Sequence, residues 1–116
     1  IRRVEVATRA VSTFAGSGTE GSADGVGDAA QFHKPAGVAL SPDGSALLVA
    51  DWGNHKIRHV EVSTGAVTTV AGSGADGSAD DVGGAAEFYF PFGVAISPDG
   101  SALFVADSCN HKIRRV

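Results

Sequence analysis

The stretch GVALSPDGSALLVADWGNHKIRHVEVSTGAVTTVA, residues 37–71, decides the fold of this chain. It contains four short runs rich in Val, Ile, Leu and Thr, and each run is followed by a turn signal. Pro42–Gly44 separates the first two runs, and Ser63–Gly65 separates the last two. Because Pro presets φ and Gly accepts a positive φ, both triplets favour tight hairpins. The stretch therefore predicts four antiparallel strands that form one small twisted sheet.

The same pattern returns with a period of 56 residues, so that residues 1–60 and residues 57–116 are identical at 42 of 60 positions. As a consequence, the tetrapeptide IRRV stands at both ends of the chain, as Ile1–Val4 and Ile113–Val116. One sheet of this size cannot bury both of its faces, whereas copies stacked around an axis can. The period therefore predicts an all-β fold built from β-propeller blades of four antiparallel strands, rather than a two-sheet sandwich or helical repeats.

The strand runs and the Gly-rich tracts between them divide the chain into five segments. The predicted segments are the third and fourth strands of an incomplete blade (1–15), a Gly/Asp-rich linker (16–36), a complete blade (37–71), a second such linker (72–92) and the first to third strands of the last blade (93–116).

A longer motif occurs in residues 35–58 and again in residues 91–114: P-x-G-V-A, then S-P-D-G, then V-A-D-x-x-N-x-K-I-R. This motif resembles the NHL repeat, with lysine (Lys56 and Lys112) in place of the family's namesake leucine. The Gly-rich linkers resemble those of bacterial and teneurin-type NHL domains. The resemblance implies a propeller, usually of six blades. It implies no single activity, because NHL domains include protein-binding, RNA-binding and catalytic members.

Two blades in one chain would leave apolar faces and strand edges in water, which favours association. The last blade lacks a fourth strand, and the front of the chain offers one. We therefore expect strand complementation between chains, either as a homotrimer that closes a six-bladed ring or as an open array. The chain could instead be a window on a longer natural chain. The residues expected to mediate assembly are Ile1, Val4, Ile113 and Val116.

The two copies differ most in the loop that enters the first strand and in the turn after the second strand. In an up-and-down sheet these connections share one rim, opposite the identical S-P-D-G-S turns. Variation on one rim of a repeat scaffold is typical of a binding face for a protein or a glycan. Drift of surface loops, or gap filling by Trp52 and Phe92, would also produce it. The candidate binding residues are His33, Lys34, Ala36, Trp52, Gly53, Tyr89, Phe90, Phe92, Ser108 and Cys109.

Four polar residues at strand ends recur unchanged: Asp51 and Asn54 in one copy, and Asp107 and Asn110 in the other. Because Asp and Asn bond to nearby backbone groups, we expect all four to cap their own turns. The linkers carry Asp-x3-Asp spacings that match no EF-hand loop. A solvated acidic loop is therefore the interpretation of these tracts, with calcium binding as the alternative.

Composition and motifs restrict the possible functions. The formal net charge of -4 argues against a nucleic-acid surface, and no run approaches the ~18 apolar residues of a membrane span. The single cysteine excludes an internal disulfide framework. Neither G-x-S-x-G, Walker A nor H-E-x-x-H occurs. We therefore expect no enzymatic activity, metal or cofactor.

The function expected is that of a non-catalytic interaction scaffold whose partners are other copies of itself and a protein or glycan, with no nucleic acid and no membrane. The alternative is a structural protein whose function is the assembly itself. Two further functions, an NHL-type lyase or hydrolase and an RNA-binding protein, are less favoured than the scaffold and the structural protein. The sequence does not specify the cellular compartment, and an extracellular or cell-surface location is the expectation.

Overall fold

The computed structural model describes the whole chain, residues 1–116. It consists of short strands and single 3₁₀ turns. None of its helices has the length and apolar character that crossing a bilayer would need. The strands are β1 (Arg2–Val4), β2 (Val11–Thr13), β3 (Gly25–Val26), β4 (Pro35–Leu40), β5 (Ala46–Asp51), β6 (Lys56–Glu61), β7 (Ala66–Ala71), β8 (Pro91–Ile96), β9 (Leu103–Asp107) and β10 (Lys112–Arg115), and the 3₁₀ turns are η1 (Gly27–Ala29), η2 (Trp52–Asn54), η3 (Gly83–Ala85) and η4 (Ser108–Asn110).

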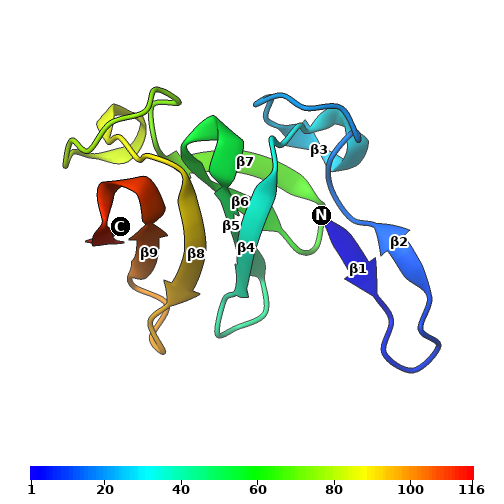
Figure 1. Cartoon of the computed structure of the whole chain (residues 1–116). Helices are drawn as coiled ribbons and strands as arrows, with labels where there is room; N and C mark the ends of the chain where they lie inside the picture. The colour runs from blue at the N-terminus through cyan, green and yellow to red at the C-terminus, as the bar shows by residue number, and fades with distance from the viewer.

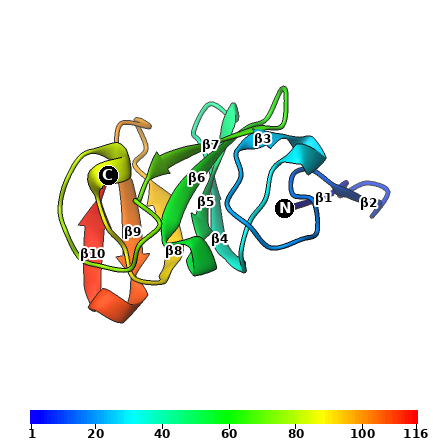
Figure 2. The same cartoon turned by 90° about the horizontal axis from the view of Figure 1, so that it is seen from above.

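The strands form three antiparallel sheets that stand side by side along the molecule (Figure 1). We name them the N-terminal hairpin (β1-β2), the middle blade (β4-β5-β6-β7, with β3 added beside β7) and the last blade (β8-β9-β10). Seen from above, the N-terminal hairpin and β10 lie at opposite ends of the molecule (Figure 2). The middle blade confirms the prediction of four-stranded antiparallel blades.

Two details differ from the predicted segments. Strands β4 and β8 begin at Pro35 and Pro91, because each proline pairs across a bulge with the Asp that ends the neighbouring strand. The first linker also contributes a strand, since Gly25–Val26 pairs with β7 as β3. The first linker is therefore part of the folded middle blade.

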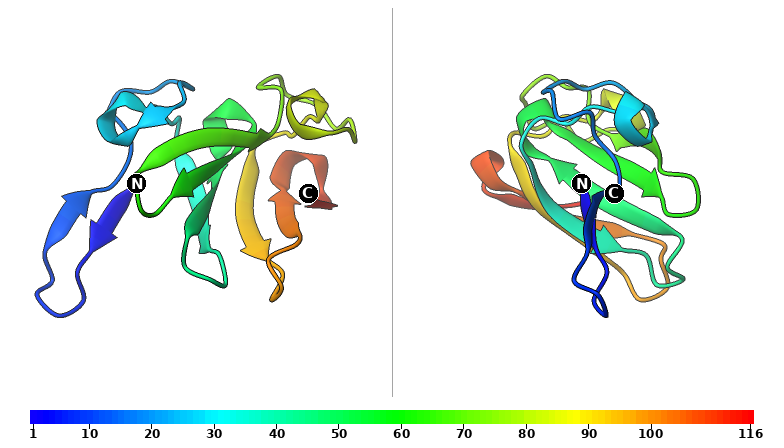
Figure 3. Two further views of the ribbon diagram at one scale, coloured as in Figure 1. Left: turned by 180° about the vertical axis from the view of Figure 1, so that it is seen from behind. Right: turned by 90° about the vertical axis from the view of Figure 1, so that its right-hand side faces the viewer.

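The main core lies between the middle and last blades, where β4 and β8 are neighbours (Figure 1). Its buried residues are Ala46, Leu48, Ala50, Ile57, Ala71, Phe88, Leu103 and Val105. A second core covers the opposite face of the middle blade with residues from the first linker and the N-terminal segment. Its members are Ala15, Ala30, Phe32, Val49, Val60 and Val67. Both linkers lie at one end of the sheets, and the S-P-D-G turns lie at the other (Figure 3).

Each S-P-D-G turn is organised by its aspartate. Asp43 Oδ1 accepts hydrogen bonds from the Ser45 backbone N–H at 3.0 Å, the Ser41 hydroxyl at 2.7 Å and the Ser45 hydroxyl at 2.8 Å. The Ser45 N–H is the largest cause that lowers the pKa of Asp43 to about 2. The Ser97 hydroxyl is the largest cause that lowers the pKa of Asp99 to about 2.

This lowered pKa predicts a loss of stability in acid. A carboxylate whose folded pKa lies below its unfolded pKa of about 3.9 stabilises the fold above that value and loses this effect as the pH falls towards 2. We expect the wild type to melt at a higher temperature than the double variant Asp43→Ala/Asp99→Ala near pH 6. That difference should shrink between about pH 4 and about pH 2. Thermal unfolding followed by circular dichroism across this range measures it.

Val82→Ala serves as the control, because Val82 is 86% exposed and carries no titratable side chain. The melting difference between the wild type and Val82→Ala should stay nearly constant over the same pH range. A difference for the double variant that does not change with pH would contradict the role of the two turn carboxylates.

Candidate functional site

A buried arginine fastens the first linker to the middle blade. Arg58 lies on β6, and Nη1 donates to Asp51 Oδ2 at 2.8 Å and to the Gln31 carbonyl at 2.9 Å. Its Nη2 donates to the Ala23 carbonyl at 3.0 Å and to Asp24 Oδ1 at 2.8 Å. The Arg58 and Asp51 side chains are both 0% exposed. Since a buried charge needs both a counter-charge and hydrogen bonds, this network holds the linker in one position.

Asp51 and Asn54 have structural contacts of a kind that the sequence does not reveal. Asp51 makes no hydrogen bond to the backbone of the turn that it begins, although Asn54 Nδ2 of that turn donates to Asp51 Oδ2 at 2.8 Å. Instead, Asp51 Oδ1 accepts the backbone N–H of His33 at 2.9 Å, and Asn54 Nδ2 donates to the Gly21 carbonyl at 2.7 Å. Both partners belong to the first linker, so these side chains also fasten the linker to the blade.

The last blade repeats the arrangement. Arg114 Nη1 donates to Asp107 Oδ2 at 2.8 Å, and Asn110 Nδ2 donates to the same oxygen at 2.8 Å. Arg114 Nη2 pairs with Asp80 of the second linker. Asp24 and Asp80 therefore bind buried guanidinium groups, while their own side chains stay 51% and 89% exposed. The reason is that each guanidinium has more N–H donors than Asp51 or Asp107 alone can satisfy.

Several of the candidate rim residues meet where the middle and last blades join. Trp52 of η2 stacks on Phe90, with ring centroids 4.0 Å apart and an interplanar angle of 20°. Tyr89 stacks on Phe90 with centroids 5.0 Å apart. The Phe90 N–H donates to His55 Nδ1 at 3.1 Å, and Lys34 Nζ lies 5.6 Å from the Trp52 ring centroid.

Beside this aromatic cluster lies a pocket of about 300 Å³, which we name the rim pocket. It is lined by Lys34, Pro35, Ala36, Trp52 and Phe92. Phe92 is 59% exposed, so its ring is available to a ligand. A cation beside two aromatic side chains can bind a molecule that combines a negative group with an apolar or ring-shaped face.

The remaining candidates lie outside the rim pocket. The Gly53 N–H donates to the His33 carbonyl at 2.8 Å, which ties η2 to the linker. Cys109 is exposed, and its backbone N–H donates to the Tyr89 carbonyl at 3.0 Å. Ser108 is exposed in η4.

Two rim residues are absent from the candidate set: Pro35 lines the rim pocket, and His55 binds the Phe90 amide. Both are identical in the two copies, and a comparison that looks for differences between copies cannot find them. For Pro35, the sequence offers one signal: this proline directly follows Lys34, a loop residue that differs between the two copies.

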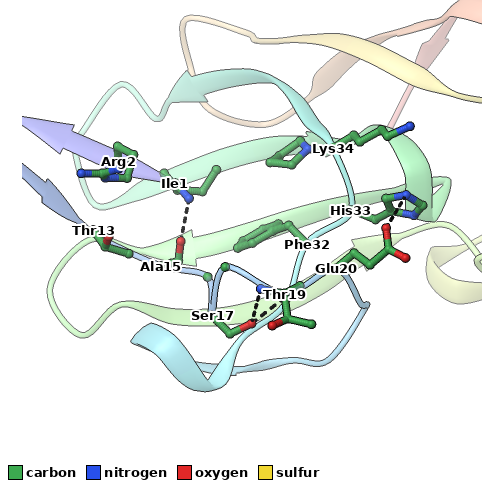
Figure 4. A pocket seen from close by; sticks show the side chains of 13 residues that line it. Ile1, Arg2, Thr13, Ala15, Ser17, Thr19, Glu20, Phe32, His33 and Lys34 are labelled. Carbon is green, nitrogen blue, oxygen red and sulfur yellow. Dashed lines mark hydrogen bonds and ion pairs between the residues drawn. The ribbon is translucent and has the colours of Figure 1, made fainter.

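A second cavity, of about 430 Å³, lies between the N-terminal segment and the first linker, and we name it the N-terminal pocket (Figure 4). Ile1, Arg2 and Thr13 lie on one side of it, and Glu20 and His33 lie on the other (Figure 4). The Ile1 amine donates to the Ala15 carbonyl at 2.6 Å. Partial burial, followed by the nearby charge of Arg2, lowers the pKa of this amine.

Known proteins share both the repeat and its geometry. The chain is 38% identical to NHL repeat-containing protein 2 of Bos taurus over 97 residues, a match that covers 81% of this chain and 13% of that protein. An auxiliary nutrient binding protein from Bacteroides thetaiotaomicron has a TM-score of 0.78 and 28% identity, over 98% of this chain and 31% of that one. A protein of unknown function from the same organism has a TM-score of 0.86 and 21% identity, over 98% of this chain and 28% of that one.

No protein-family model matches the chain. The antiparallel blades and their match to solved structures define a β-propeller built from sequence repeats. Its repeats are NHL repeats, and the chain belongs with the NHL-repeat β-propellers. It spans 13% of the length of the curated relative named above.

Proposed function

We propose that this chain is a non-catalytic NHL-repeat scaffold that binds a protein or a glycan at the rim pocket. The observation that supports the proposal is the pairing of the Lys34 cation with the Trp52 and Phe92 rings around one pocket. None of these three residues is shared by the two repeats. They therefore distinguish one blade from the other, which is typical of a binding surface on a repeat scaffold.

The chemistry of the rim pocket suits an acidic ligand. Aromatic rings bind the faces of sugars and apolar side chains, and an ammonium group binds a carboxylate or sulfate. An acidic oligosaccharide and an acidic peptide with an aromatic residue share these features. The solved auxiliary nutrient binding protein is described as a binding protein, which favours binding over catalysis as the role of this chain.

The test uses two probes, an oligogalacturonate and a peptide rich in Glu and Tyr, titrated against the chain while Trp52 fluorescence is recorded. The variant Lys34→Gln keeps the side-chain stem and removes its charge. A charged hydrogen-bonding partner is worth about 1.5–3 kcal/mol, so the affinity for whichever probe binds should fall by about tenfold or more.

Phe104→Ala is the control, because Phe104 is an exposed aromatic residue of β9 that does not line the rim pocket. It should leave the affinity unchanged. Equal losses for Lys34→Gln and Phe104→Ala, or no binding of either probe by the wild type, would count against the rim pocket as the binding site.

A further inference from the structure

The outer edge of β10 pairs with no other strand of this chain. In the middle blade, β7 pairs with the outer edge of β6 in the register Arg58↔Thr69 and Val60↔Val67. In the last blade, β10 pairs with β9 on one side and with no strand on the other. The Arg115 N–H points to that free side, because the Val116 N–H bonds to the Leu103 carbonyl of β9 and the direction of N–H groups alternates along a strand.

The chain already contains a strand that fits the four residues at this edge. Strand β2 pairs with β1 in the register Arg2↔Thr13, Arg3↔Ser12 and Val4↔Val11. Residues 113–116 repeat residues 1–4 without a change. The edge of β10 therefore offers β2 the same side chains, with the same spacing, that β1 offers.

We propose that β2 of a second copy pairs with the outer edge of β10, leaves its own β1, and becomes the fourth strand of the last blade. The register is Thr13 opposite Arg114 and Val11 opposite Val116. It reproduces the register between β7 and β6 in the middle blade. The partner is thus a second copy of this chain, bound head to tail.

Polar contacts favour β10 over β1 as the partner of β2. In the middle blade, Thr69 Oγ1 donates to Asp24 Oδ1 at 3.1 Å. The repeat places Thr13 in the position of Thr69, and Asp80, which is 89% exposed, in the position of Asp24. Docking of β2 brings this donor to that acceptor. Within one chain, the Arg2 side chain next to β2 bonds only to the Ser12 carbonyl, at 3.3 Å.

Apolar burial favours the same exchange. Every residue of β1 and of β2 is exposed, so little is lost when the two strands separate. Val60 is 0% exposed and packs in one core with Val67. Their counterparts, Val116 and Val11, are 38% and 55% exposed in the single chain. Pairing of β2 with β10 gives these two valines the contact that the middle blade already has.

The N-terminal pocket supplies a second half of the same interface. At the junction inside the chain, His55 Nδ1 accepts the N–H of Phe90 at 3.1 Å. The counterpart of Phe90 is Lys34, whose backbone N–H has no acceptor in the chain and which lines the N-terminal pocket. The counterpart of His55 is His111, which is exposed. Docking of β2 on β10 places the turn that carries His111 over the N-terminal pocket of the second copy.

The test blocks one end of the interface at a time. Ser12→Pro removes a backbone donor from β2, and Arg115→Pro removes the outward donor of β10 while the bonds to β9 stay in place. Native mass spectrometry at concentrations near 50 µM compares each variant with the wild type. The wild type should give multiples of 11.6 kDa, and each variant alone should give a monomer.

A mixture of the two variants is the decisive test. Ser12→Pro keeps an intact β10 edge and Arg115→Pro keeps an intact β2, so one molecule of each can form a single complete interface. The mixture should give a 1:1 heterodimer and nothing larger. Formation of that dimer also shows that both variants are folded. A monomeric wild type, single variants that still assemble, or a mixture that stays monomeric would overturn the proposal.

Removal of residues 1–4 provides a second readout that needs no proline. These residues compete with β10 for β2, so the shortened chain should assemble at lower concentration than the wild type. Weaker assembly of the shortened chain would show that β1 supports the interface rather than competes with it, and would contradict the strand exchange.

Discussion

Replacement of Asp51 by alanine should lower the free energy of unfolding by about 3–5 kcal/mol, the largest loss that we expect from a single substitution in this chain. The reason is that the fully buried Arg58 guanidinium would lose its fully buried carboxylate partner and keep only Asp24, whose side chain is 51% exposed. The same substitution removes the acceptor of the His33 N–H and of one Asn54 N–H. Urea denaturation followed by circular dichroism measures the loss, with unchanged m-values as the check on a two-state transition.

The last blade contains the matched control. Asp107→Ala makes the same chemical change, but the Arg114 side chain is 8% exposed and keeps some access to water. We expect a smaller loss than for Asp51→Ala when both are measured on dilute protein. Equal losses, or a loss below about 1 kcal/mol for Asp51→Ala, would show that the buried ion pair does not hold the linker on the blade.

Replacement of Gly37 by alanine should separate the two blades. A Cβ at this position would lie 2.5 Å from the Phe92 carbonyl oxygen and 3.0 Å from the Gly93 Cα, both of them backbone atoms of the neighbouring blade. Backbone cannot move aside as a flexible side chain can, so β4 and β8 would have to move apart. Overpacking of this kind costs about 1–3 kcal/mol, which urea denaturation would detect.

The single tryptophan gives this variant a second readout. Trp52 belongs to the middle blade and stacks on Phe90 at the entrance to the last blade. Its emission should therefore shift to longer wavelength in Gly37→Ala as the blades separate and water reaches the indole.

Gly93→Ala is the control for the close approach. Gly93 holds the same repeat position as Gly37, but a Cβ there would meet only the Ala106 Cβ, at 3.9 Å, which is an ordinary contact. In dilute protein this variant should stay within about 0.5 kcal/mol of the wild type and keep its Trp52 emission. A large effect of Gly93→Ala, or none of Gly37→Ala, would mean that the approach of β4 to β8 does not control the junction.

The strands and their turns follow from local sequence. Runs of β-branched residues, together with the Pro42–Gly44 triplet, predict the hairpin that the structure contains between β4 and β5. The start of β4 was not predictable, because Pro35 pairs with Asp51 only across a bulge in the folded sheet. Local patterns specify where a strand exists more closely than where it begins.

The candidate rim was visible only in part. Lys34 and Trp52 stand out because the second repeat replaces them. Their assembly into one pocket with Phe92 depends on how two blades pack against each other. No periodicity within one blade carries that information.

Residue pattern and repeat length were enough to establish the all-β architecture, the blade as its unit and the NHL character of the repeats, since hairpins form between neighbours in sequence. The bonding partners of the charged side chains, in contrast, depend on the tertiary structure. Arg58 binds Asp24 across 34 residues, and nothing local distinguishes that aspartate from Asp28. A buried guanidinium must bond to the acceptors that the surrounding backbone places near it. Its contacts therefore depend on how the linker packs over the blade.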